Sequence, residues 1–83
     1  MNQTETTNKV FEILEDLCAS EIQDETQQLI LDLQMDSLKM VMLLVMIEES
    51  FEIELEESDM NPFALISVKD VITLVRKYQK EET

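Results

Sequence analysis

The chain has 83 residues, no glycine, no histidine, one cysteine and a formal net charge of −13 at pH 7. Its length is that of one small domain, so we expect a single domain over residues 1–83. A chain without glycine cannot form a glycine-rich phosphate loop or a dinucleotide-binding fingerprint. A chain without histidine lacks the usual general base and the commonest metal ligand, so we expect neither an enzyme nor a metal site.

The acidic charge also limits the partners. It repels nucleic-acid phosphates and anionic lipids, so we expect neither a nucleic acid nor a membrane as partner, but basic protein partners instead. The first nine residues lack the charged start and apolar run of a signal peptide. The longest apolar stretch, residues 40–47, is too short to span a bilayer. These features predict a cytoplasmic monomer.

The N-terminal part predicts a frayed tail over about residues 1–6 and then a helix that begins near Thr7 or Asn8. Apolar residues follow at helical spacing, namely Val10, Ile13, Leu14 and Leu17, with Cys18 beside them. The lone cysteine excludes an internal disulfide, and its place on this stripe favours a buried, inert thiol over a reactive one.

Residues 19–34 are polar with a few apolar side chains: Ile22, Leu29, Ile30, Leu31 and Leu33. They predict a long, ordered loop between the first and second helices. Loops of this length are uncommon unless they have a function.

The second helix should begin at Asp36 or Ser37 and run to about Phe51, and its apolar side chains fall on two faces. The face that we call the inner face holds Met40, Leu43, Leu44, Ile47 and Phe51. The opposite face, which we call the outer face, holds Leu38, Val41, Met42 and Val45, with Glu48 and Glu49 at its far end. One apolar face suffices to bury a helix against a bundle. The outer face therefore indicates either a helix buried all round or an exposed surface that binds partners.

The start of this helix carries the tripeptide Asp36-Ser37-Leu38. A helix N-terminus presents free N–H groups and the positive end of the helix dipole, so a phosphodiester on Ser37 would lie where an anion is favoured. The alternative is that Asp36 and Ser37 are ordinary capping residues.

The C-terminal part predicts a connector, a short helix and a longer helix. Residues 53–55 alternate like a strand but have no second strand to pair with, so we expect an extended connector. A short third helix should start at Asp59, with Pro62 in its first turns. Ser67 should cap the last helix, with Asp70 completing a capping box and Ile66 packing on Val71 as a hydrophobic staple. Residues 81–83 should be a second frayed tail.

The predicted fold is all-α: a small four-helix bundle of three main helices and a short third one, with a long loop between the first and second helices.

Three blocks of sequence resemble the phosphopantetheine-binding signature of acyl carrier proteins. They are residues 33–38 with Val41 and Leu43, residues 48–55, and residues 67–71, the last being similar to the start of that family's final helix. The resemblance covers about residues 7–80. It implies a four-helix bundle that carries 4′-phosphopantetheine, taken from coenzyme A, on the serine that begins the second helix.

The resemblance also implies roles for individual residues. Ser37 would hold the arm, Asp36 would help to position it for a phosphopantetheinyl transferase and its magnesium, and Leu38 would contact partners. The family's recognition face would here be Val41, Met42, Val45, Glu48 and Glu49. Two positions depart from the family: Gln34 stands where glycine is usual, and Met42 stands where carriers of primary fatty acid synthesis usually have an acid.

Four functions remain open from the sequence. The first is a stand-alone carrier of acyl or aminoacyl thioesters for polyketide or nonribosomal peptide synthesis, with a loading enzyme and a ketosynthase or condensation-type enzyme as partners. The second is a carrier for primary fatty acid synthesis, and the third a carrier for D-alanyl transfer. The fourth is a helical adaptor that binds a partner through the second helix, with Ser37 only a cap.

Overall fold

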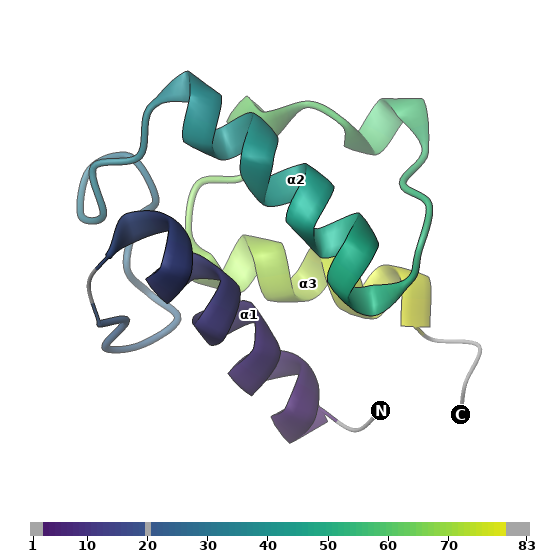
Figure 1. The fold of residues 1–83 in the computed structure, drawn as a ribbon, viewed down its shortest axis with the longest axis horizontal. Coiled ribbons are helices and arrows are strands. Elements are labelled where there is room, and N and C mark those ends of the chain that lie inside the picture. Colours follow the sequence, from purple (N-terminus) through teal and green to yellow (C-terminus); the bar gives the residue numbers. More distant parts are fainter. Residues whose placement is uncertain (1–2, 20, 80–83) are drawn as a thin grey trace.

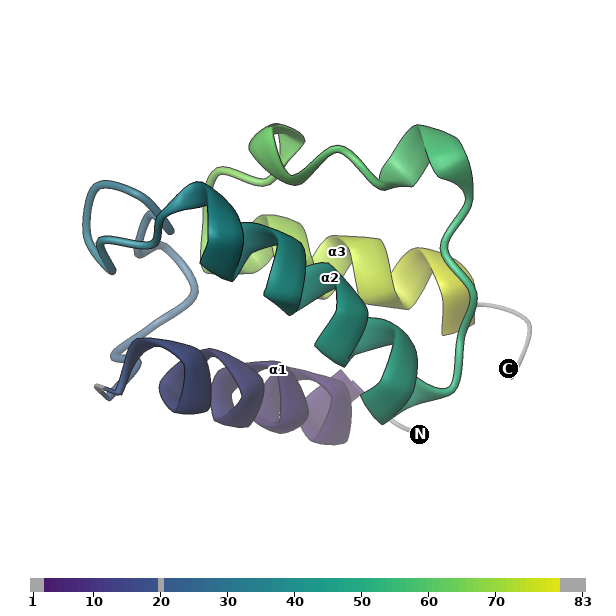
Figure 2. The same cartoon turned by 45° about the horizontal axis from the view of Figure 1, so that its top comes forward.

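The computed structural model describes residues 3–19 and 21–79 (Figure 1). Its elements are α1 (Gln3–Cys18), α2 (Ser37–Phe51), two 3₁₀ turns called η1 (Glu57–Asp59) and η2 (Pro62–Ala64), and α3 (Val68–Gln79). Figure 2 shows α2 lying across α1 and α3, while the connection from α2 to α3 runs back along the molecule. The described residues thus form an all-helical bundle, as predicted.

Helix α1 begins earlier than the sequence suggested, at Gln3 rather than at Thr7 or Asn8. The reason is a contact with the far end of the chain: Thr6 is only 1% exposed, and its Oγ1 donates a hydrogen bond to Gln79 Oε1 at 2.8 Å. The predicted frayed tail is therefore wrong for residues 3–6. Residues 1–2 and 81–83 lie outside the described part of the chain.

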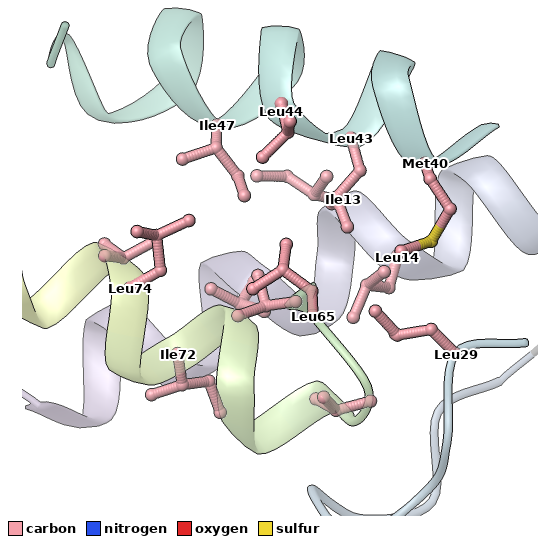
Figure 3. Close-up of a cluster of buried hydrophobic side chains, with 14 of the residues drawn as sticks. Ile13, Leu14, Leu29, Met40, Leu43, Leu44, Ile47, Leu65, Ile72 and Leu74 are labelled. Atoms are coloured by element: carbon pink, nitrogen blue, oxygen red, sulfur yellow. The ribbon is translucent and has the colours of Figure 1, made fainter. Parts of the chain in front are cut away.

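The core lies between the three helices and takes the inner face of α2 (Figure 3). All five inner-face residues are buried, and they pack with apolar side chains of α1 and α3. Leu29 and Leu65, which come from the two connections, extend into the same cluster. The division of α2 into two faces is thus confirmed, and the alternative of a helix buried all round is wrong.

The loop between α1 and α2 is ordered by backbone bonds to the start of α3. Leu29 N donates to Ile66 O at 2.8 Å, Val68 N to Gln27 O at 3.0 Å, and Lys69 N to Glu25 O at 2.9 Å. Only some of the loop's apolar residues face the core: Ile22 and Leu29 are buried and Leu33 is half-buried, whereas Ile30 and Leu31 are exposed.

The expected third helix is replaced by the two 3₁₀ turns η1 and η2. The break lies at Asn61-Pro62. Proline has no N–H to donate and disfavours helical backbone in the residue before it. Asn61 instead closes a local turn, because its Oδ1 accepts from Phe63 N at 3.1 Å and its backbone O from Ala64 N at 3.1 Å.

Helix α3 begins with the predicted capping box. Asp70 N donates to Ser67 Oγ at 3.4 Å, and Ser67 N donates to Asp70 Oδ2 at 3.1 Å. The same carboxylate oxygen accepts from Ile66 N at 2.9 Å. The predicted staple is wrong: Val71 is fully buried, but the Ile66 side chain is 61% exposed.

Three side chains tie η1 to the last turn of α3, and we call them the Asp59 cluster. Tyr78 Oη donates to Asp59 Oδ2 and accepts from Glu56 N at 2.9 Å, while Lys77 Nζ lies 2.9 Å from Asp59 Oδ2. The Tyr78 hydroxyl, followed by the Lys77 ammonium, lowers the pKa of Asp59. The hydrogen bond to Asp59 in turn raises the pKa of Tyr78.

We predict that Tyr78→Phe lowers stability most between pH about 4 and about 10. The lowered pKa of Asp59 stabilises the fold above that group's ordinary pKa of about 3.9, and this contribution is lost as the pH falls. The raised pKa of Tyr78 stabilises the fold below its ordinary pKa of about 10 and is lost as the pH rises. Urea unfolding of both proteins at pH 3, 7 and 11 measures the difference. Equal differences at the three pH values would contradict the coupling.

Candidate functional site

Ser37 is the first residue of α2, and its side chain is exposed. The preceding Asp36 is the N-cap: its Oδ1 accepts from Lys39 N at 2.9 Å, and its backbone O accepts from Met40 N at 3.0 Å. The first N–H groups of the helix, those of Ser37 and Leu38, have no acceptor within the helix. The hydroxyl therefore stands beside free donors at the positive end of the helix dipole.

This arrangement fits a covalently attached phosphodiester. An anion on Ser37 Oγ would be favoured by the dipole and could accept from the free N–H groups of the first turn. The exposure of Ser37 also leaves room for a modifying enzyme to reach the hydroxyl. Asp36 is already engaged by the cap, so its carboxylate is held in place next to the serine.

The chain reaches Ser37 through a residue in left-handed backbone conformation. Gln34 has a φ of 57°, which lies in the left-handed region. This conformation costs a non-glycine residue about 1–2 kcal/mol. The next residue, Met35, is buried, and its N–H donates to Leu29 O at 3.0 Å. The turn at Gln34 thus places Met35 in the core and turns Asp36 and Ser37 to the surface.

The four apolar side chains of the outer face of α2 are exposed to solvent. The exposed fractions are 67% for Leu38, 49% for Val41, 44% for Met42 and 45% for Val45. Glu49 is also exposed, but Glu48 is half-buried and its Oε2 accepts from Leu55 N at 2.9 Å. The structure therefore brings Ser37 and the predicted apolar recognition residues onto one surface, while Glu48 also holds the connector after α2.

A second group of exposed apolar residues was not predicted from the sequence. Ile30 and Leu31 from the first connection lie with Phe63 and Ile66 from the second around one pocket. The run Leu29-Ile30-Leu31 could have indicated this exposed group, because a loop cannot turn three consecutive side chains into one core.

Cys18 is half-buried, and burial raises its pKa, an effect that nearby Lys39 partly offsets. This favours the inert thiol over the reactive one, because the thiolate is the reactive form. Within residues 3–19 and 21–79 no group of acidic, histidine or cysteine side chains is arranged to hold a metal ion. In the same ranges no helix combines the length and the apolar character that crossing a bilayer requires.

A family model described as a phosphopantetheine attachment site matches residues 8–75. The match covers most of the chain, from the second turn of α1 to the end of the buried stripe on α3. The chain belongs to this family. Its members carry covalent 4′-phosphopantetheine and are carrier domains without catalytic activity of their own. A search of curated proteins gave no significant match.

We predict that Gln34→Gly stabilises this carrier by about 0.5–1 kcal/mol, whereas Gln34→Ala does not. Glycine removes the left-handed penalty of about 1–2 kcal/mol, although the more flexible unfolded chain offsets about half of the gain. Alanine also loses the Gln side chain but keeps the Cβ that causes the penalty. Urea unfolding of the three proteins is the measurement, and equal stabilities of the alanine and glycine variants would contradict the interpretation.

Proposed function

We propose that Ser37 is the attachment site and that the chain carries acyl or aminoacyl groups for polyketide or nonribosomal peptide synthesis. The observation that carries the first part is the exposed Ser37 hydroxyl at the N-terminus of α2, inside the matched region. The adaptor alternative gives this hydroxyl no role beyond capping. The structure shows that Asp36, not Ser37, supplies the side-chain cap of α2.

In the attachment step Ser37 Oγ would attack the pantetheine-side phosphorus of coenzyme A. An O–P bond forms, the phosphoanhydride bond breaks, and adenosine 3′,5′-bisphosphate leaves. The serine proton passes to a base of the phosphopantetheinyl transferase, since the carrier has no histidine to accept it. Asp36, fixed by its bond to Lys39 N, would help to position the serine for the transferase and its magnesium.

The attached arm supplies a terminal thiol, which holds the cargo as a thioester. The contribution of this chain is to present that thiol to other enzymes. We propose the outer face of α2 as the surface that they bind, because four apolar side chains beside Ser37 are exposed on it. The exposed Glu49 and the net charge of −13 would speed encounter with basic partners.

The proposed pathway rests on Met42. This side chain is 44% exposed on the outer face, where carriers of primary fatty acid synthesis usually present an acid. An exposed thioether favours partners with an apolar contact surface, and its flexibility suits several of them. The expected partners are a loading enzyme and a ketosynthase or condensation-type enzyme.

We predict that the chain gains one phosphopantetheine group at Ser37 when it is incubated with coenzyme A and a broad-specificity transferase. Intact mass and peptide mapping measure the gain and its position. Ser37→Ala should abolish the gain and keep the fold, because the side-chain cap comes from Asp36. Modification at Ser50, Ser58 or Ser67 would contradict the assignment.

We predict that Val45→Asp lowers the kcat/KM of modification about tenfold or more, with little loss of stability. An interface contact of this kind contributes roughly 1–3 kcal/mol, and the exposed side chain adds little to the core. Leu43→Ala should do the reverse and destabilise by about 2–5 kcal/mol, because Leu43 is fully buried.

The matched control for Val45→Asp is Thr73→Asp, which adds the same charge at an exposed position of α3. It should leave the modification kinetics nearly unchanged. Transferase kinetics and thermal unfolding are measured on all three variants. If Val45→Asp unfolds the domain, or if Thr73→Asp slows modification equally, the outer face is not the docking surface.

A further inference from the structure

The basic residues of the chain are concentrated near its C-terminal end. Four of the six Lys and Arg residues lie within residues 69–80, together with one of the nineteen acids. That acid, Asp70, is occupied by the capping box, where its Oδ2 accepts from Ile66 N and Ser67 N. A chain of net charge −13 therefore has a base-rich region on α3.

Two of these bases share one exposed face of α3 with Thr73. Lys69, Thr73 and Arg76 are spaced by four and then three residues, which places them on one helix face, and all three are exposed. We call these three residues the basic stripe. Lys69 and Arg76 lie about 10 Å apart along the helix axis, at about 1.5 Å per residue. In the described part of the chain Lys77 pairs with Asp59, whereas neither basic residue of the stripe forms an ion pair.

Stabilisation of the helix itself accounts for only part of the basic stripe. Arg76 lies in the last turn of α3, where a cation complements the negative end of the helix dipole. Lys69 lies in the first turn, where a positive charge meets the positive end of the dipole and is unfavourable. The position of Lys69 is therefore better explained by a contact outside the chain than by the stability of α3.

Arg76 also borders a pocket of about 240 Å³ between α1 and α3, which we call the Arg76 pocket. Its other lining residues are Thr4, Thr7 and Asn8, so the lining has two hydroxyls, an amide and a guanidinium but no acid. Arg76 Nη2 donates a long hydrogen bond to Thr7 Oγ1 at 3.5 Å. A guanidinium has five N–H groups, so donors remain for a bound group. Since a carboxylate can accept two of them side by side, this lining suits a carboxylate.

The Arg76 pocket lies at the end of the molecule that is opposite to Ser37. Figures 1 and 2 both show the first turn of α2 at one end and the last turn of α3 at the other. The start of α1 lies beside the end of α3, where Thr6 Oγ1 donates to Gln79 Oε1. A protein bound at the Arg76 pocket would therefore leave Ser37 and the outer face of α2 open.

We propose that the basic stripe and the Arg76 pocket together bind an acidic segment of a protein partner, at a surface separate from the one that presents Ser37. Charge complementarity selects this occupant, because two cations about 10 Å apart match carboxylates spaced along a peptide. A short segment touches only this base-poor carrier's basic face, and acids farther away than a Debye length of about 8 Å repel it little.

A second copy of this chain is disfavoured as the occupant. It would bring many acids of both molecules within a Debye length, and two molecules of net charge −13 repel each other. The proposal does not depend on an arm at Ser37, so it can be tested on the unmodified chain.

The test titrates the ¹⁵N-labelled chain with a capped tetraglutamate peptide and follows the amide signals by NMR. Four extended residues span up to about 13 Å, which is enough to reach from Arg76 to Lys69. The peptide should shift the signals of Thr7, Lys69, Thr73 and Arg76 in a saturable way and leave that of Val45, on the outer face of α2, in place. Capped tetraglutamine, which has the same length but no charge, should shift none of them.

The variants Lys69→Gln and Arg76→Gln should each weaken the binding of tetraglutamate about two- to fivefold, as expected for the loss of one exposed charge pair. Arg76→Lys should weaken it less, because the charge remains but the planar fork is lost. The matched control is Lys39→Gln, which changes the net charge equally on α2 and should leave the affinity unchanged. Circular dichroism and thermal unfolding check that each variant keeps the fold.

Every other outcome would overturn the proposal. The absence of a saturable shift, or equal shifts with tetraglutamine, would show that the surface does not select acids. Equal weakening by Lys39→Gln would mean that only the net charge matters. Inorganic phosphate that bound at the same residues with the same affinity would make the pocket a site for small anions. Self-association in sedimentation that Arg76→Gln abolished would assign the surface to a second copy. Failure to modify Ser37, measured separately, would contradict only the proposed function.

Discussion

A bundle of three helices can bury an apolar helix on one side only, and the remaining features of this carrier follow from that limit. Helix α2 uses Leu43 and Ile47 to complete the core with α1 and α3. Its opposite side, which includes Val41 and Val45, has no helix left to cover it. The same geometry leaves the first turn of α2 at the surface, where its free N–H groups and the Ser37 hydroxyl meet solvent.

The loop before α2 determines where that first turn begins. Leu29 and Met35 are both buried and joined by a backbone bond, so the segment between them, residues 30–34, is fixed to the core at both ends. In a chain without glycine, Gln34 takes the left-handed conformation needed to reach Met35. The burial of Met35 can offset a conformational cost of about 1–2 kcal/mol. The same loop places Ile30 and Leu31 in the second group of exposed apolar residues. The positions of the serine and of the pocket that this group lines therefore both depend on how this loop is fixed to the core.

Patterns that repeat along the sequence predicted the features that depend on local spacing. Features that depend on a single contact between residues far apart in sequence could not be predicted. The two faces of α2 and the capping box of Ser67 and Asp70 follow from local spacing, and both are confirmed. The early start of α1 depends on Thr6 meeting Gln79, a contact between residues far apart in sequence. The outward position of Ile66 depends on its backbone bonding to Leu29, which hydrophobic spacing cannot reveal.

We propose that α2 presents Ser37 and the outer face together to the enzyme that modifies the carrier. The most direct measurement is methyl NMR of the unmodified chain titrated with a phosphopantetheinyl transferase. We expect the methyl signals of Leu38, Val41, Met42 and Val45 to broaden or shift first, while those of Ile13 and Ile72, both buried, stay in place. Perturbation that spares α2 and centres on the exposed side of α1 or α3 would contradict it.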